Sequence, residues 1–172
     1  MARLSYVDKE TAEPEQQRVL AQVTQKSGKI ANIWKLWAHS PQTLETFVAY
    51  YKTLMKGTLD PKLRELAYIK VSTINDCPYC AESHKGAGRR AGLTDPQILE
   101  IANHAESTAY SALEKLVLRY AEELTRTAKS SEEVLTELRK NLSEADIIEL
   151  NLIVGTANLT NRFNMSMMTD MD

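Results

Sequence analysis

Residues 60–88 read DPKLRELAYIKVSTINDCPYCAESHKGAG, and this stretch predicts two helices joined by a very short corner. Pro61 and Pro78 each suit the first turn of a helix, where a fixed φ and a missing N–H do no harm. The apolar residues between these prolines cover a wide helical face, so we expect the first helix to be largely buried. Glu65 lies among them, where a carboxylate is costly to place. Either its side chain reaches water at the edge of the buried face, or it has a chemical task.

Helical signals extend over the rest of the chain. All five prolines fit near a first helical position, and Ser40, Asp60 and Asp95 precede three of them as capping side chains. Gly57 and Gly92 stand where C-terminal caps would. No segment shows sustained alternation of apolar and polar residues between turn signals, so we expect no sheet. The sequence predicts an all-α fold with helices over residues 14–27, 41–56, 61–75, 78–91, 96–104, 109–129 and 131–141, and a long last helix capped by Ser143 and Asp146.

Length and charge limit the class of protein. With 172 residues, the chain fits one compact multi-helix domain, residues 1–172, with a single sizeable core. Lys and Arg number 21 against 23 Asp and Glu, and this balance favours neither a nucleic-acid partner nor a membrane surface. No run approaches the ~18 apolar residues of a membrane span, and no apolar leader opens the sequence. We expect a cytoplasmic protein, in which a CxxC is catalytic or metal-binding rather than a structural disulfide.

Both cysteines of the chain, Cys77 and Cys80, lie in the corner, and His84 follows four residues later. If Cys77 caps the helix that starts at Pro78, the three side chains stand at i, i+3 and i+7 on one stripe. The partial positive charge and free N–H groups of a helix start favour thiolate over thiol. His84, one turn beyond Cys80, is placed to take or return a proton. The set predicts reversible dithiol chemistry.

The same residues permit other interpretations. Cys77, Cys80 and His84 could be three ligands of a zinc ion, with His39, His104 or a carboxylate as the fourth. Because structural zinc needs four ligands and the chain has no second CxxC, the redox interpretation is favoured. Two inert buried cysteines are a third interpretation, which leaves the histidine on the same stripe unexplained.

Around these residues the sequence resembles the carboxymuconolactone decarboxylase-like family, in its alkylhydroperoxidase D (AhpD)-like branch. The similar run is LDPKLRELAYIKVSTINDCPYCAESHKGAGRRAGLTDPQI, within a region of about residues 50–110. That branch shows a glutamate, a CxxC twelve residues on, and a histidine four residues past the second cysteine. These positions are here Glu65, Cys77, Cys80 and His84.

The resemblance implies an all-α homotrimer or homohexamer that reduces hydroperoxides without metal, haem or flavin. AhpD members use the cysteine pair, recharged by a dithiol on a partner, such as a lipoylated or thioredoxin-like protein. The second cysteine, Cys80, would attack, and Cys77 would resolve. Where AhpD enzymes carry a histidine just before the second cysteine, this chain has Tyr79, which implies a shorter proton relay. A non-enzymatic zinc-binding module, and a general dithiol exchanger or redox sensor with little peroxidase activity, are the alternatives.

Helix geometry limits what Glu65 can do. Twelve residues of helix span ~18 Å, so Glu65 cannot touch Cys77 along its own helix. If the second helix folds back antiparallel, the axial offset between Glu65 and His84 is ~7 Å, which a crossing angle or a water could close. We therefore expect Glu65 to orient His84 and share its proton.

The last helix, over residues 147–163, predicts an oligomer. It mixes Ile148, Leu152 and Leu159 with Gly155, and a methionine-rich end follows. One short-helix domain would not cover all of these side chains. The alternative is that this helix only completes the core of the monomer.

Overall fold

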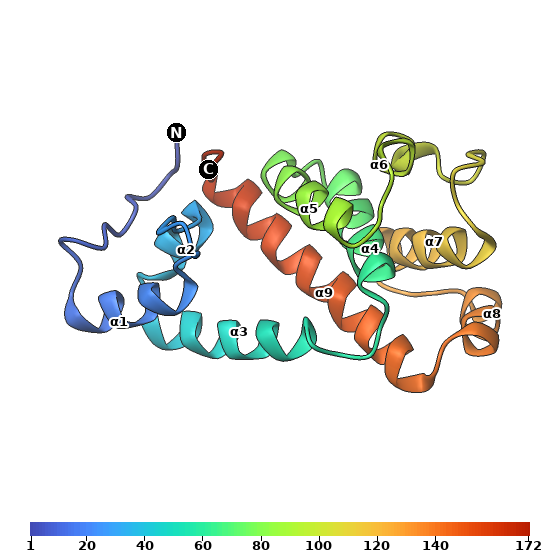
Figure 1. Cartoon of the computed structure of the whole chain (residues 1–172), viewed down its shortest axis with the longest axis horizontal. Coiled ribbons are helices and arrows are strands. Elements are labelled where there is room, and N and C mark those ends of the chain that lie inside the picture. The colour runs from blue at the N-terminus through green and yellow to red at the C-terminus, as the bar shows by residue number, and fades with distance from the viewer. The chain divides into compact units, whose positions relative to one another are not determined.

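The computed structural model describes residues 1–172 and contains nine α-helices, one 3₁₀ helix and no strand, which confirms the all-α prediction (Figure 1). The elements are α1 (Pro14–Val23), α2 (Asn32–Trp37), α3 (Pro41–Leu54), α4 (Pro61–Ile74), α5 (Pro78–Arg90), α6 (Asp95–Leu99), η1 (Ile101–Asn103), α7 (Ala112–Thr127), α8 (Glu132–Asn141) and α9 (Glu144–Met167). None of the helices combines the length and apolar character that a membrane span needs.

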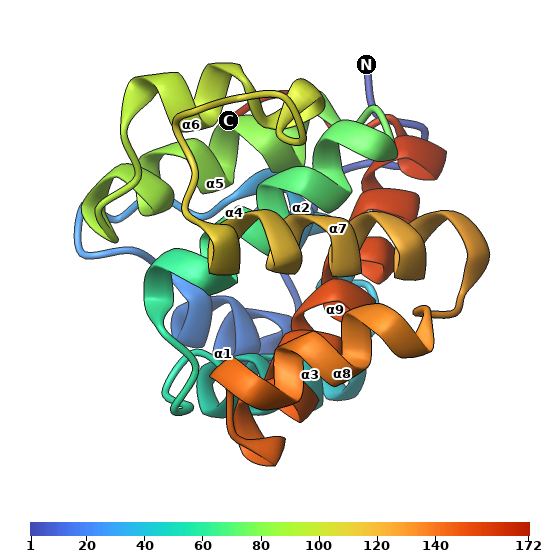
Figure 2. The same cartoon turned by 90° about the vertical axis from the view of Figure 1, so that its right-hand side faces the viewer.

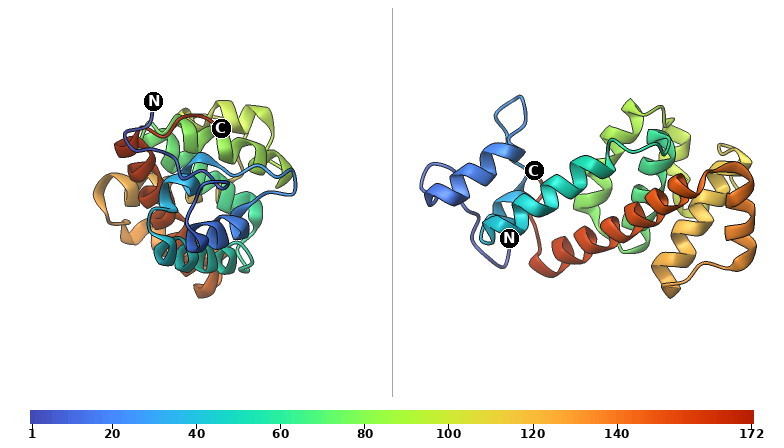
Figure 3. Two further views of the ribbon diagram at one scale, coloured as in Figure 1. Left: turned by 90° about the vertical axis from the view of Figure 1, so that its left-hand side faces the viewer. Right: turned by 90° about the horizontal axis from the view of Figure 1, so that it is seen from below.

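The contacts divide the chain into two compact units. The first unit holds residues 1–56 and 164–172, and the second holds residues 57–163. Helix α9, the long red helix of Figure 3, contributes most of its length to the second unit. The single domain over residues 1–172 remains a prediction.

The first unit is built on helices α1, α2 and α3. Its core is a cluster of buried apolar side chains from these helices and from the segments around them: Val7, Val19, Leu20, Ile30, Ala38, Leu44 and Val48. Trp34 and Trp37 of α2 pack against this cluster, and both rings contact Phe47 of α3. Helix α2 is not among the predicted helices, because its six residues are too few to show a helical period.

In the second unit, helix α4 is central. Helices α5 and α7 both pack against it, and α8 packs against α7 (Figure 2). Every residue from Leu63 to Ser72 is buried, which confirms the prediction of a largely buried helix. The core also takes four fully buried side chains from α9, namely Leu150, Ile153, Val154 and Ala157.

The prolines mark helix starts as predicted, but only some of the predicted caps form. Asp60 accepts a hydrogen bond of 2.7 Å from the Lys62 N–H, and Ser143 forms reciprocal bonds with Asp146. Ser40 precedes α3 without a capping bond, because its hydroxyl donates to Thr43 instead.

Four other predictions of caps and lengths are wrong or in part wrong. Thr94, not Asp95, caps α6, since it forms a capping box with Gln97. Gly92 follows α5 with a left-handed φ of 96°, as expected for a C-terminal cap. Gly57 has no left-handed φ; instead, the Glu149 carboxylate occupies the space that a Cβ atom at this position would need. The predicted helix over residues 96–104 is broken into α6 and η1, and α1 ends at Val23 because the next residue is extended.

Candidate active site

The corner between α4 and α5 fixes the position of the cysteine pair. The N–H groups of Asp76 and Cys77 donate to the carbonyls of Thr73 and Ser72 over 3.3 and 2.9 Å, which are the two bonds of a Schellman motif. Asp76 has a φ of 51°, a left-handed conformation that aspartate tolerates better than most residues. Cys77 then has an extended backbone and caps α5. The residue that closes one helix thus opens the next.

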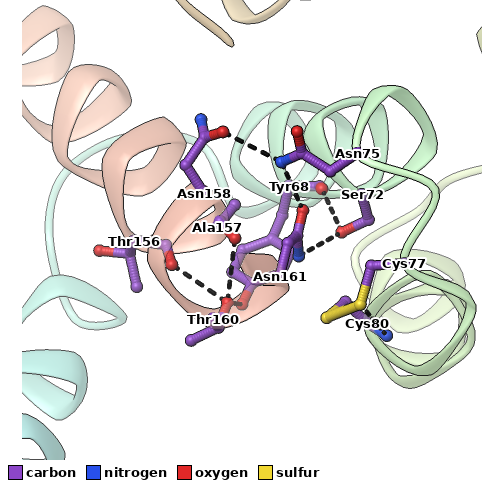
Figure 4. The surroundings of a disulfide bond; sticks show 10 residues. All are labelled: Tyr68, Ser72, Asn75, Cys77, Cys80, Thr156, Ala157, Asn158, Thr160 and Asn161. Atoms are coloured by element: carbon purple, nitrogen blue, oxygen red, sulfur yellow. Dashed lines mark hydrogen bonds between the residues drawn. A yellow bond between two sulfur atoms is a disulfide. The ribbon is translucent and has the colours of Figure 1, made fainter. Parts of the chain in front are cut away.

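Cys77 and Cys80 are joined by a disulfide at the start of α5, and their Cα atoms are 5.4 Å apart (Figure 4). The Cys80 N–H donates to Sγ of Cys77 over 3.4 Å, so the sulfur caps the helix as the sequence predicts. Both residues are buried, with exposed fractions of 1% and 3%. After reduction, a thiolate on Cys77 would accept a hydrogen bond from this N–H and lie at the positive end of the helix dipole.

Glu65 and His84 meet directly. Oε2 of Glu65 lies 2.8 Å from Nδ1 of His84, and their side chains are 10% and 14% exposed. The packing of α5 against α4 closes the axial offset that helix geometry predicts, and no bridging water is needed. The alternative, in which Glu65 reaches water at the edge of a buried face, is wrong. His84 follows Cys80 by one turn of α5, so the carboxylate, the imidazole and the thiol pair belong to one region of the molecule.

Tyr68 is a site residue that the sequence analysis missed. Its ring stacks on the His84 imidazole with a centroid separation of 3.4 Å and an interplanar angle of 12°. Its hydroxyl forms a hydrogen bond of 2.5 Å with Thr160 of α9. A signal was present in the sequence, because Tyr68 follows Glu65 by three residues and therefore shares its helical stripe.

A chain of polar side chains from α4 and α9 lies beside the disulfide (Figure 4). The buried Asn161 amide donates to Oγ of Ser72 over 3.2 Å and accepts from the Asn75 amide over 3.1 Å. Asn75 also donates to Asn158 over 3.0 Å. Since Ser72 and Asn75 belong to the last turn of α4 and its C-cap, these bonds hold the corner that carries Cys77. No local pattern predicts contacts between residues so far apart in the chain.

The structure gathers no group of three or more His, Cys, Asp or Glu side chains that could hold a metal ion. Neither histidine that could be the fourth ligand of a zinc site belongs to a group of ligands with the cysteine pair. Nε2 of His39 lies 2.8 Å from the Ser5 carbonyl oxygen. His104 is buried, and burial, followed by the charge of Lys70, lowers its pKa. Tyr79, between the cysteines, is a buried packing residue.

Comparison with known proteins places this site in a family. Residues 41–123 match the model of the carboxymuconolactone decarboxylase family. The uncharacterized protein YdfG of Bacillus subtilis is 26% identical over 130 residues, which are 74% of this chain and 88% of that protein. These matches include the corner and all of the site residues contributed by α4 and α5.

Solved structures share the fold across nearly the whole chain. An uncharacterized peroxidase-related protein from Silicibacter sp. TM1040 is 28% identical, with a TM-score of 0.81 over 99% of this chain and 92% of that one. A peroxidase-related protein with an alkylhydroperoxidase AhpD core, from Ralstonia eutropha JMP134, has a TM-score of 0.85 at 20% identity over the same shares.

A variant of the debrominase Bmp8 in complex with 2,3,4-tribromopyrrole has a TM-score of 0.83 at 19% identity, over 100% of this chain and 94% of that one. At this identity the likeness concerns the fold alone. The family match, the two corner helices with their cysteine pair and the AhpD-core neighbours agree with one another. Residues 41–123 therefore resemble the carboxymuconolactone decarboxylase family, and the fold of the chain is that of the AhpD-like proteins.

Proposed function

We propose that this chain is a dithiol peroxidase, which reduces hydroperoxides through a cycle of the Cys77–Cys80 dithiol and disulfide. The observation that carries this proposal is the disulfide at the start of α5, one turn before a histidine that is hydrogen-bonded to a buried glutamate. A thiol pair at a helix start and an oriented acid–base group are what reversible thiol chemistry requires.

In the proposed cycle the Cys80 thiolate attacks one oxygen of the hydroperoxide. The O–O bond breaks, the alkoxide leaves as an alcohol after it takes a proton, and Cys80 becomes a sulfenic acid. Cys77 then attacks the sulfenic sulfur, water leaves, and the disulfide forms. The peroxide gains two electrons and the thiol pair loses two.

The Glu65–His84 pair serves the proton transfers in this cycle. Because Glu65 binds Nδ1, the imidazole is left with Nε2 for exchange with a thiol or a leaving group. His84 accepts the proton of Cys80 and returns it to the alkoxide, while the carboxylate holds the ring and balances its charge. Glu65 thus acts through His84 and not directly on Cys77.

The oxidised pair must be recharged by a dithiol. Two thiol–disulfide exchange steps would transfer the electrons through a mixed disulfide. A lipoylated or thioredoxin-like protein is the class of donor that we propose, and the cytoplasm, where thiols stay reduced, is the compartment that suits this cycle. We propose a homotrimer or homohexamer as the working assembly.

Intact mass spectrometry tests the cycle directly. Reduced protein is treated with a hydroperoxide, unfolded in acid and alkylated, and untreated protein is processed in parallel. Peroxide should remove the mass of two hydrogen atoms and block alkylation of both cysteines, and a dithiol should restore both. If peroxide leaves both thiols open to alkylation, or adds oxygen without forming the disulfide, the proposal is wrong.

A dithiol exchanger or redox sensor with little peroxidase activity would also use this disulfide. The two functions differ in turnover: a peroxidase consumes many equivalents of peroxide when a dithiol is supplied, whereas a sensor stops after one. Because the debrominase Bmp8 shares the fold, a brominated pyrrole belongs in the same panel of oxidants. Metal analysis of protein purified without added zinc tests the zinc-binding alternative, for which the structure offers no ligand group.

A further inference from the structure

The imidazole of His84 is held at its edge and on its face by two residues of one helix. Glu65 binds Nδ1, and Tyr68, one turn later on α4, stacks its ring on the imidazole with centroids 3.4 Å apart and planes 12° from parallel. Tyr68 is 4% exposed and the His84 side chain 14%, so this stack is largely shielded from water. The face contact is a second constraint on His84 that the Glu65 hydrogen bond does not supply.

The geometry of the stack favours a charged imidazole over a neutral one. Two neutral aromatic rings prefer offset or edge-to-face arrangements, because directly facing π-systems repel. A cation over the face of a tyrosine ring is attracted instead, and more strongly when water is excluded. A near-parallel contact at this separation therefore suits the imidazolium that forms when His84 takes a proton.

The Tyr68 hydroxyl fixes the ring rather than supplying a proton. Thr160 donates its own hydroxyl proton to the carbonyls of Thr156 and Ala157, at 3.0 and 3.1 Å (Figure 4). The oxygen of Thr160 is thus the acceptor in its bond with Tyr68, and the phenol is the donor. Helix α4 holds the tyrosine at its backbone, and α9 holds it at its hydroxyl.

We propose that Tyr68, clamped by Thr160, is a positioning residue that stabilises the imidazolium form of His84 and so promotes thiolate formation on the cysteine pair. This inference rests on the assignment, in the proposed function, of His84 as the acceptor of the thiol proton. It adds to the Glu65–His84 pair a third residue and a link to α9. Tyr68 itself exchanges no proton in this scheme.

The test follows thiolate formation in the reduced full-length protein by its ultraviolet absorbance as the pH is raised. Tyr68→Leu removes the ring face and should move the first thiolate step to higher pH by roughly 0.5–1 unit, from the strength of a partly desolvated cation–π contact. Tyr68→Phe and Thr160→Val remove the same hydrogen bond from its two ends. They should each move the step in the same direction, by less than the leucine variant and by similar amounts.

Tyr120→Leu is the matched control. Tyr120 is also buried, and its hydroxyl is hydrogen-bonded to Asn151, but it lies on α7 and its ring does not stack on an imidazole. This variant should lose stability without moving the thiolate step. A Tyr68→Leu profile that superimposes on the wild type, or an equal shift in Tyr120→Leu, overturns the inference. If Tyr68→Leu does not fold, unchanged profiles in both Tyr68→Phe and Thr160→Val overturn it.

The proposed function is tested separately by peroxide consumption of the wild type under the same conditions. A wild type whose thiolate step depends on Tyr68 but which consumes no hydroperoxide would contradict the peroxidase proposal and leave this inference standing. A working peroxidase whose thiolate step does not depend on Tyr68 would contradict this inference and leave the peroxidase proposal standing.

Discussion

Glu65 and His84 form a hydrogen bond of 2.8 Å between Oε2 and Nδ1, although they are nineteen residues apart in the chain and belong to different helices. A buried carboxylate without such a partner would be costly. Its position on the buried face of α4 is thus explained by the imidazole that α5 presents to it.

Glu65→Gln tests whether this carboxylate is needed for the chemistry. Glutamine keeps the size and one hydrogen bond but not the charge that balances an imidazolium. We expect the fold to persist and peroxide reduction to slow by at least about tenfold, and by up to the ~10²–10⁴-fold that a general acid–base group typically contributes. The measurement is the rate of disulfide formation on folded, fully reduced protein.

Glu82→Gln is the control for that variant, since Glu82 lies on the exposed side of α5 and pairs only with Lys85. It should leave the rate unchanged. Equal rates in Glu65→Gln and wild type would show that the Glu65–His84 bond is only structural.

Much of this region follows from local rules, and some of it does not. Pro61 and Pro78 mark two helix starts, and Cys77 is predicted and found as a cap, because these features depend on neighbouring residues only. The approach of Glu65 to His84 could be estimated only to within several ångströms, since it depends on how the helices cross. The helical spacing places Tyr68 on the stripe of Glu65, but its stack on His84 and its bond to Thr160, 92 residues later, depend on tertiary packing and could not be predicted locally.

His104 should make folding stability depend on pH. Burial, then the charge of Lys70, lowers its pKa, and the charge of Glu122 offsets this only in part, while Lys115 lowers it further. Between the lowered value and the ordinary value of about 6.5, the unfolded chain binds more protons than the folded chain. Stability contributed by this group is therefore present above pH ~6.5 and is lost as the pH falls below it.

Thermal melting above and below pH ~6.5 measures this dependence. His104→Gln should flatten the pH profile of the melting temperature in that range. His39→Gln, at an exposed histidine, should leave the profile as it is. If the pH profiles of both variants are as steep as that of the wild type, the dependence comes from other groups.

The prediction of a homotrimer or homohexamer concerns the exposed side of α9. Ile148, Leu152 and Leu159 are 61%, 41% and 51% exposed, and Gly155 lies between them with open space at its Cβ position. Their spacing places them on one stripe, which is an apolar surface that a second copy would bury. The other side of the helix fills the core, with Leu150, Ile153 and Val154 fully buried, and the oligomer stays a prediction.

Light scattering at micromolar concentration tests the assembly. The wild type should have three or six times the monomer mass, and Leu152→Glu should lower it by placing a charge in the interface. Leu99→Glu is the control, because Leu99 is 81% exposed on α6, outside the stripe. A wild type that stays monomeric would contradict the prediction.

Two features of the structure favour different cysteines as the attacking thiol. Sγ of Cys77 accepts the Cys80 N–H at the helix start, which favours a thiolate on Cys77. A helix terminus typically contributes ~0.3–1 kcal/mol, which is less than one pKa unit. Cys80, one turn before His84, has a base on its own stripe that can both take its proton and return one to the leaving alkoxide. The second effect is the larger, so we predict that Cys80 attacks.

Single cysteine variants separate these assignments. In Cys77→Ser, a sulfenic acid on Cys80 has no resolving thiol and should accumulate after one equivalent of peroxide, where dimedone traps it and mass spectrometry locates it. In Cys80→Ser, Cys77 keeps the helix terminus but stands a further turn from His84, so it should react with peroxide no faster than a free thiol. The opposite pattern, with a trapped sulfenic acid on Cys77 and a slow Cys80, would mean that the N–H and the helix terminus outweigh the neighbouring base.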